Sequence, residues 1–207
     1  MRRPGDRPQV YLIGTAGHPH YGDEVITAAW LRYYADRLPE ADVWLDTPRP
    51  GSTAVLHSDS HPRLRCVDTL FQACWSAPTG DPAGAVAFGS HVIDNTGLLP
   101  REASGLARAR QADIVHIMGG AYINAYWPQH LALIGGAARL ASLSGAVSAA
   151  TGASFAPAGD SLRNVLRESL GGLDVVDVRD EWSARLLEGA VPSLTLTGDD
   201  ALLDLTR

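Results

Sequence analysis

Short apolar segments alternate with helical patterns along almost the entire chain. The first pair is QVYLIGT at 9–15 and the segment at 22–38, in which apolar side chains recur at helical spacing. Further strands are expected at 41–46, 112–120, 145–155, 173–180 and 193–205, and further helices at 101–112, 129–144, 161–170 and 181–190. Because strands separated by helices pair in parallel, this order predicts a doubly wound α/β sandwich of three layers with a mainly parallel sheet.

Two segments, 47–64 and 76–84, are expected to be surface loops because Pro, Gly and Ser are frequent in them. No repeat of fixed period interrupts the alternation of strands and helices. A chain of 207 residues is about the size of one large domain. The sequence therefore predicts a single Rossmann-like domain over residues 1–207.

The chain contains no lysine, so all 17 of its basic residues are arginines. This excludes a Schiff base on the chain, a P-loop lysine and an anchored pyridoxal phosphate. The formal net charge of −6 also argues against a basic surface for nucleic acid. We therefore expect neither nucleic-acid binding nor lysine-dependent chemistry.

The sequence also favours an ordinary cytoplasmic protein. Cys66 and Cys74 are too few for a disulfide scaffold, and neither lies in a zinc-binding spacing. The apolar segment near the N-terminus is too short for a signal peptide or a membrane span. We therefore expect the cytoplasm and no transmembrane segment, while a homo-oligomer stays open.

The first candidate ligand site is the loop GTAGHPHYGDE at 14–24. Gly17 and Gly22 would let the backbone turn sharply and approach a ligand at a helix N-terminus. Their spacing is not that of the dinucleotide motif, and the carboxylates of Asp23 and Glu24 would repel a pyrophosphate. Two interpretations stay open: either these carboxylates accept hydrogen bonds from sugar hydroxyls, or Asp23 caps the helix and Glu24 complements its dipole.

The second candidate follows the expected strand at 112–120. Two glycines and a group of aromatic and amide side chains lie there: Gly119, Gly120, Tyr122, Asn124, Tyr126 and Trp127. Aromatic side chains beside glycines suit a sugar ring, although the same aromatic residues could pack beneath the next helix as ordinary core. The amide of Asn124 has no such simple structural explanation.

The third candidate is VRDEWS at 178–183. At the end of a strand, the Arg179 guanidinium could clamp a carboxylate or a phosphate. Alternatively, Asp180 caps the next helix and Arg179 is its surface partner. The histidines form no HxxxH or HxH pair on an expected helix, and His18 and His20 flank Pro19 in a loop, so we expect no metal site. No GxSxG motif indicates a serine nucleophile.

Several of these motifs occur together in an order that resembles the polysaccharide pyruvyl transferase family. They are GTAGHPHYGDE at 14–24, MGGAYIN at 118–124, TGASFAP at 151–157, VRDEWS at 178–183 and TGDDA at 197–201. The resemblance covers nearly the whole chain.

The resemblance implies a two-domain transferase similar to the GT-B arrangement. Pyruvate would move from phosphoenolpyruvate, the donor substrate, onto a sugar or lipid-linked saccharide as a ketal, in cell-surface polysaccharide biosynthesis and without a cofactor. The chain resembles the N-terminal half of such an enzyme. A second domain would carry a catalytic histidine and further basic residues for the donor.

The resemblance also implies roles for individual residues. Arg179 would bind the donor anion, Asp23 and Asn124 would orient the acceptor, and the glycines would admit the ligand closely. The residues expected to contact substrate are Gly17, His20, Gly22, Asp23, Glu24, Gly119, Gly120, Tyr122, Asn124, Arg179 and Asp180.

Three positions depart from the family pattern. His20 replaces the usual Asn, Ala121 replaces a third glycine, and Asp200 stands where Pro is usual. Histidine and asparagine present different donors and acceptors, and a methyl group at position 121 changes the shape available to a ligand. Two alternatives stay open: the acceptor domain of a GT-B glycosyltransferase, and a sugar-binding domain without catalytic activity.

Overall fold

The chain folds around one parallel sheet of seven strands, in the order β3-β2-β1-β4-β5-β6-β7. The computed structural model describes residues 7–206. The strands are β1 (Gln9–Ile13), β2 (Asp42–Asp46), β3 (Leu64–Val67), β4 (Ile114–Ile117), β5 (Val147–Ala153), β6 (Val175–Val178) and β7 (Leu194–Leu196). The α-helices are α1 (Tyr21–Arg37), α2 (Pro50–Leu56), α3 (Thr69–Ser76), α4 (Pro82–Asp94), α5 (Ala103–Ala109), α6 (Leu131–Ser144), α7 (Asp160–Leu170) and α8 (Glu181–Leu187). Short 3-10 helices are η1 (Thr96–Leu98), η2 (Pro100–Glu102), η3 (Pro128–His130) and η4 (Asp200–Thr206).

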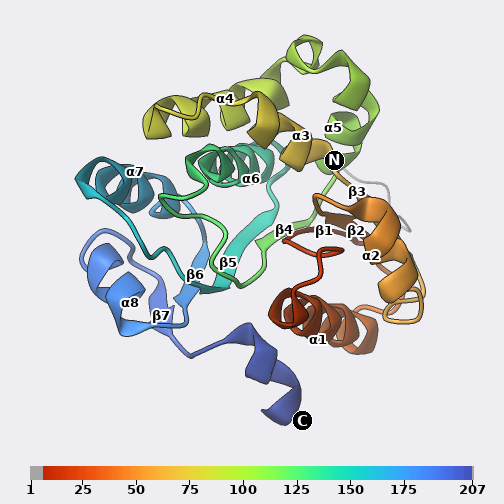
Figure 1. Cartoon of the computed structure of the whole chain (residues 1–207). Helices are drawn as coiled ribbons and strands as arrows, with labels where there is room; N and C mark the ends of the chain where they lie inside the picture. The colour runs from red at the N-terminus through yellow and green to blue at the C-terminus, as the bar shows by residue number, and fades with distance from the viewer. Residues whose placement is uncertain (1–6, 207) are drawn as a thin grey trace.

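Side chains on both faces of β1 are buried, as expected for a central strand of a parallel sheet. Val10 and Leu12 join a core cluster with side chains of α1, whereas Tyr11 and Ile13 join a larger cluster with side chains of α3 to α8. Figure 1 shows α1 and the C-terminal segment on one face of the sheet and α3, α4 and α6 on the other. The expected doubly wound, three-layer α/β fold is therefore confirmed.

The chain reverses its direction across the sheet between β1 and β4. After β1 the chain leads through α1 to β2 on one side, whereas β4 leads through α6 to β5 on the other side. The two crossover helices therefore diverge from adjacent strand ends. In doubly wound sheets, ligands bind in the crevice at such a switch point, beyond the carboxyl ends of the strands.

The expected loop at 47–64 is wrong in its central part, which forms α2, whereas turns and irregular backbone flank that helix. Pro50 occupies the first turn of that helix, where proline has no amide to lose and its φ angle already fits. Thr53 faces inward, is fully buried and donates its hydroxyl to the Arg49 carbonyl. The edge strand β3 follows at the end of the expected loop.

Three further elements differ from the sequence prediction. The expected loop at 76–84 overlaps the start of α4, where Asp81 caps the helix by accepting from the Gly84 amide at 2.9 Å. Helix α3 was not predicted. The last expected strand, 193–205, is shortened to β7 and followed by η4. Most other strands and helices lie where the alternating pattern places them, with ends shifted by a few residues.

Candidate functional site

A cleft of about 870 Å³ opens at the switch point, beyond the carboxyl ends of β1, β2 and β4. Its walls come from the loops after these strands, from α3 and from η3. The lining residues are Thr15, His18, His20, Asp23, Pro48, Arg49, Asp68, Phe71, Gln72, Trp75, Ala121, Tyr122, Trp127 and His130. Of the residues expected to contact substrate, the cleft brings together His20, Asp23 and Tyr122.

Glu24 fixes the loop that forms one wall of the cleft. One carboxylate oxygen accepts from the Gly17 amide at 2.8 Å, and the other lies 2.7 Å from Nε2 of the buried His57. Gly17 has a φ angle of +79°, and a Cβ there would lie 2.6 Å from the carbonyl oxygen of Arg49. Gly17 and Glu24 therefore hold the β1–α1 loop against the loop after β2.

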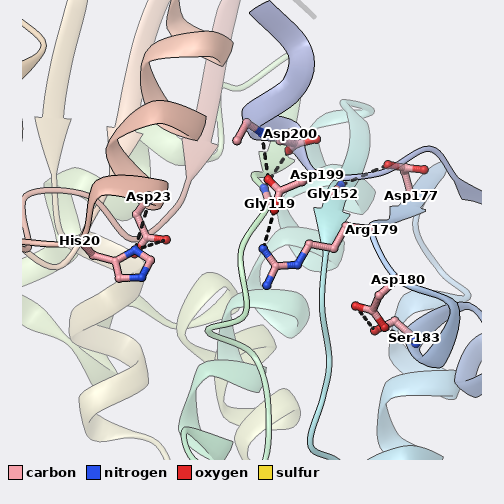
Figure 2. Close-up of polar contacts among 11 residues, drawn as sticks. His20, Asp23, Gly119, Gly152, Asp177, Arg179, Asp180, Ser183, Asp199 and Asp200 are labelled. Carbon is pink, nitrogen blue, oxygen red and sulfur yellow. Dashed lines mark hydrogen bonds and ion pairs between the residues drawn. The ribbon is translucent and has the colours of Figure 1, made fainter. Parts of the chain in front are cut away.

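His20, and not Asp23, caps α1. The His20 Nδ1 accepts from the Asp23 amide at 3.3 Å, and the helix begins one residue before the expected start at Gly22. The Asp23 carboxylate lies 3.3 Å from the same ring nitrogen (Figure 2). Partial burial raises the pKa of Asp23, although His20 opposes the shift. Asp23 is therefore a cleft carboxylate that does not serve as the helix cap.

Arg49 lines the cleft and contributes a positive charge to it. Its guanidinium forms no hydrogen bond or ion pair with any residue in the described range 7–206. The indole rings of Trp75 and Trp127 also line the cleft, and each residue is 52% exposed. Gln72 adds an amide whose Nε2 donates to Asp68 at 2.8 Å. Exposed indoles beside amide and carboxylate groups suit a sugar ring.

Tyr122 and His130 form the inner wall of the cleft. The buried Tyr122 hydroxyl lies 3.2 Å from the Ile13 carbonyl and 2.9 Å from the Met118 carbonyl, which ties the ends of β1 and β4 together. The His130 Nδ1 lies 2.7 Å from the carbonyl oxygen of Tyr122. Burial lowers the pKa of His130, so the ring is neutral near pH 7. Of the aromatic residues considered as core, Tyr122 is buried, whereas Tyr126 and Trp127 are exposed.

The Asp200 carboxylate lies so close to Gly119, the first of the paired glycines, that position 119 has no room for a side chain. Its carboxylate accepts from the Gly119 amide at 3.0 Å, and a Cβ on Gly119 would lie 2.8 Å from the carboxylate oxygen. Gly120 has a φ angle of +131°, and a Cβ there would lie 2.9 Å from the Tyr122 ring and 3.8 Å from an Asp23 oxygen. Gly119 therefore admits a side chain of the protein itself, and Gly120 faces the β1–α1 loop.

Asp200 also ends a buried chain of hydrogen bonds. Thr151 donates its hydroxyl proton to Asp200 at 2.7 Å, so its oxygen accepts from the His116 Nε2 at 2.8 Å. The His116 Nδ1 then accepts from the Tyr34 hydroxyl at 3.1 Å. Burial lowers the pKa of His116 to about 3, so this histidine stays neutral. Trp30 donates to Asp200 as well, at 2.7 Å.

Arg179 and Asp180 lie at the end of β6, outside the cleft lining. The Arg179 guanidinium forms its ion pair with Asp199 at 2.8 Å (Figure 2), and it acts on Asp180 only through its charge, which helps to lower the pKa of Asp180. Asp180 caps α8 by accepting from the amide and hydroxyl of Ser183. These hydrogen bonds lower the pKa of Asp180 against the opposing effect of burial. The capping interpretation of Asp180 is therefore confirmed.

Asn124 holds the turn after the paired glycines. Its amide nitrogen donates to the Ala121 carbonyl at 2.6 Å, and its amide oxygen accepts from the Tyr126 amide at 2.8 Å. The side chain is buried and does not belong to the cleft lining. This turn presents Ala121 and Trp127 to the cleft.

The sequence analysis missed several residues of the cleft lining, among them Arg49, Gln72, Trp75 and His130. Arg49 lies in the expected loop at 47–64, but its place shortly after a strand was a usable signal, because strand ends meet at one edge of the sheet. Gln72 and Trp75 lie on α3, which was not predicted. His130 has no partner histidine nearby in the sequence, so only the fold brings it to the site. Within the described residues no group of three or more His, Cys, Asp or Glu side chains is placed to hold a metal ion.

Comparisons with known proteins agree on the fold. A family model described as polysaccharide pyruvyl transferase matches residues 20–206. The chain is also similar in structure to the crystal structure of Anabaena Alr3699/HepE in complex with UDP, with a TM-score of 0.51 and 12% sequence identity. That match covers 93% of this chain but 44% of the other, so the chain spans less than half the length of that protein. A comparison with curated protein sequences finds no match.

Proposed function

The chain belongs to the polysaccharide pyruvyl transferase family, and from this membership we propose that it forms the acceptor-binding half of an enzyme that transfers pyruvate to a sugar. Phosphoenolpyruvate would be the donor, and the product would be a cyclic ketal on two hydroxyls of a free or lipid-linked saccharide. A second domain would face the cleft and complete the site. We place the reaction in the cytoplasm and expect it to need no cofactor.

The observation that carries this proposal is the composition of the cleft at the switch point. Two half-exposed indoles, Trp75 and Trp127, line the same cavity as the Asp23 carboxylate and the Gln72 amide. Indole rings cover the apolar face of a sugar, and carboxylates and amides accept and donate hydrogen bonds to its hydroxyls. In this arrangement Asp23 orients the acceptor, as the sequence suggested, and Asn124 shapes the cleft from behind the turn.

The cleft also supplies a positive charge for an anion. The Arg49 guanidinium has no partner within the described range, whereas the Arg179 guanidinium is held by Asp199 at 2.8 Å. A guanidinium with all its donors available binds a carboxylate or phosphate more readily than one that must first break an ion pair. We therefore assign the donor carboxylate or phosphate to Arg49 and propose that Arg179 acts only after its pairing with Asp199 changes.

The test is phosphate release from phosphoenolpyruvate by a protein that contains this chain, supplied with a panel of methyl hexopyranosides and with saccharides extracted from its own cells. Release that depends on the acceptor would support the proposal. Trp127→Ala or Trp75→Ala should raise the KM for the acceptor by about 3- to 10-fold, since aromatic contacts are worth about 0.5–1.5 kcal/mol.

Matched controls separate binding from general damage. Trp182→Ala, on α8, and Tyr126→Ala remove exposed aromatic side chains that do not line the cleft, so both variants should keep the wild-type KM. Arg49→Ala should raise the KM for phosphoenolpyruvate more than Arg179→Ala does. Equal acceptor KM values in the Trp127 and Trp182 variants would contradict the assignment of the cleft.

Because the structure of Anabaena Alr3699/HepE contains UDP, the experiment also tests the alternative that the chain is the acceptor domain of a glycosyltransferase. If the chain serves a glycosyltransferase, the complete protein would consume a nucleotide sugar and ignore phosphoenolpyruvate. The same reactions should therefore be run with UDP-sugars, and UDP release without phosphate release would replace the proposed donor. Saccharide binding without turnover of either donor would indicate a binding domain.

A further inference from the structure

His130 is a buried histidine with one ring nitrogen engaged and the other free. The residue is 8% exposed and lines the cleft. Its Nδ1 lies 2.7 Å from the Tyr122 carbonyl oxygen, which can only accept a hydrogen bond, so Nδ1 carries a proton. In a neutral imidazole the Nε2 atom then presents a lone pair.

The neighbours of His130 fix the plane of its ring. The Trp127 ring stacks on it with a centroid distance of 5.8 Å and an interplanar angle of 11°. The Phe71 ring meets it edge-on at 5.6 Å and 85°. With the hydrogen bond to Tyr122, these contacts leave the ring little freedom to rotate or to exchange its two nitrogens.

The free nitrogen of His130 is accessible to solvent. Nε2 has no hydrogen-bond partner among residues 7–206, and it is not among the unpartnered polar atoms sealed inside the described structure. A fixed, unprotonated nitrogen at the wall of a binding cleft is positioned to accept a proton from a bound hydroxyl.

We propose that His130 is a catalytic residue of the acceptor side, whose Nε2 accepts the proton of the attacking sugar hydroxyl. The assignment depends on the proposed function, because the hydroxyl belongs to the acceptor saccharide. Trp127, which stacks on the imidazole, would bring the sugar ring and the base to the same wall of the cleft. His130 is thus distinct from the histidine expected in a second domain.

The chemistry balances with the two substrates alone. Two hydroxyl oxygens of one sugar form bonds to C2 of phosphoenolpyruvate, and the C2–O bond to phosphate breaks with its electron pair leaving on phosphate. The methylene carbon C3 gains one proton and becomes a methyl group. The hydroxyls lose two protons in total, one balancing the proton gained at C3 and one leaving with phosphate. His130 takes one hydroxyl proton and passes it to the departing phosphate.

His130→Asn separates the base from the structural hydrogen bond. The asparagine amide nitrogen can replace Nδ1 as the donor to the Tyr122 carbonyl, but nothing replaces the acceptor at Nε2. In a protein whose wild type releases phosphate, kcat should fall by about 100- to 10,000-fold, the usual contribution of a general base. The acceptor KM should change by less than about 3-fold, because binding contacts are kept. His91→Asn, at an exposed histidine of α4, should leave both constants unchanged.

The outcomes distinguish the two proposals. Wild-type phosphate release together with a wild-type kcat in His130→Asn would overturn the role of His130 and leave the proposed function intact. If the wild type releases no phosphate with any acceptor, the proposed function fails, and a second measurement then decides the case of His130.

That second measurement does not depend on turnover. In the ¹⁵N NMR spectrum of protein labelled at histidine, His130 should show the tautomer protonated at Nδ1. Its Nε2 resonance should shift when a methyl hexopyranoside saturates the cleft. A tautomer protonated at Nε2, or an Nε2 resonance that does not move in the saturated complex, would overturn the inference.

Discussion

The acidic residues near the carboxyl edge of the sheet divide into two kinds. Asp177 and Asp200 are buried and each accept several hydrogen bonds from backbone and side-chain donors. Asp23 is half-buried and lies in the cleft lining, where its carboxylate can reach a ligand. The environment of each carboxylate, and not its residue type, therefore decides whether it stabilises the fold or serves the site.

Asp46 shows how burial couples a single carboxylate to pH. It accepts from the Tyr11 hydroxyl and from the amides of Leu70 and Phe71 at the start of α3. Burial nevertheless raises its pKa to about 7. Between about pH 4 and pH 7 the folded protein therefore holds a proton on Asp46 that the unfolded chain has lost.

We expect this proton to make stability depend on pH. The contribution of Asp46 to the free energy of unfolding is complete below about pH 4 and is lost as pH rises to about 7, with a total on the order of 4 kcal/mol. Asp46→Asn should remove this component, so urea unfolding at several pH values should show wild type losing stability relative to the variant as pH rises. The exposed Asp59→Asn should run parallel to wild type; a parallel Asp46→Asn curve would contradict the prediction.

At the scale of elements, α4 and α6 pack closely because each helix has a glycine where it meets the backbone of the other. A Cβ on Gly89 would overlap the carbonyl of Ala132, and a Cβ on Gly135 would overlap the carbonyl of Val86. The Ser90 hydroxyl also donates to the Gly135 carbonyl at 3.1 Å. The two helices therefore approach each other at a distance that a larger side chain at either glycine would prevent.

Gly89→Ala should destabilise the protein although alanine favours a helix. The clash with the backbone of α6 should cost about 1–3 kcal/mol, more than the gain of about 1 kcal/mol in helix propensity. The matched control is Gly51→Ala in α2, where a Cβ meets open space and the same propensity should stabilise. Chemical denaturation of both variants checks the pair, and a Gly89→Ala variant as stable as wild type would be inconsistent with the packing.

The elements that the sequence did not predict share a physical cause. Pro50 and Gly51 are common in loops, but proline suits the first turn of a helix, and α2 places it there. Helix α4 contains Gly84 and Gly89, which weaken a helical pattern, yet packing against α6 makes Gly89 necessary. Local patterns predicted the amphipathic helices and every strand except the short edge strand β3, whereas α2 and α4 depend on contacts distant in sequence.

The candidate site, like the fold, was predicted only in part from the sequence. The position of the cleft follows from the alternation of strands and helices, because that order dictates a switch point, and Asp23 and His20 were found from the loop after β1. Arg49 carried a usable signal, its place shortly after a strand, but its lack of a partner is visible only in the structure. His130 could not be assigned from the sequence, because only the fold brings it to the cleft. Asn124 and Gly119 were expected to contact substrate, but neither lines the cleft, and the contacts that the structure shows for them are made within the protein.

On the scale of the whole molecule, Asp200 joins the C-terminal segment to the body of the sheet. Its carboxylate links η4 to Trp30 on α1, to Gly119 after β4 and to Thr151 on β5. The neighbouring Asp199 is 35% exposed at its side chain and contacts Arg179.

The two adjacent aspartates should therefore differ sharply on substitution. Asp200→Ala leaves three donors without their acceptor, and at about 1–3 kcal/mol per buried unpaired group the loss should reach at least about 3 kcal/mol. Asp199→Ala removes a partly exposed ion pair and the hydrogen bond from the Ala201 amide, and it should cost about 1–2 kcal/mol. Urea denaturation of both variants measures the difference, and equal losses would show that the buried network contributes little.

The carboxyl edge of the sheet is thus open on one side of the switch point and closed on the other by the C-terminal segment. Side chains around the open cleft, such as Arg49 and Trp75, are exposed, whereas the closed side contains the buried network of Asp200. Natural variation can consequently fall unevenly on the two sides. Exposed cleft residues can be exchanged without threatening folding, while the closed side tolerates few changes, so the chemistry of the cleft can change while the scaffold stays the same.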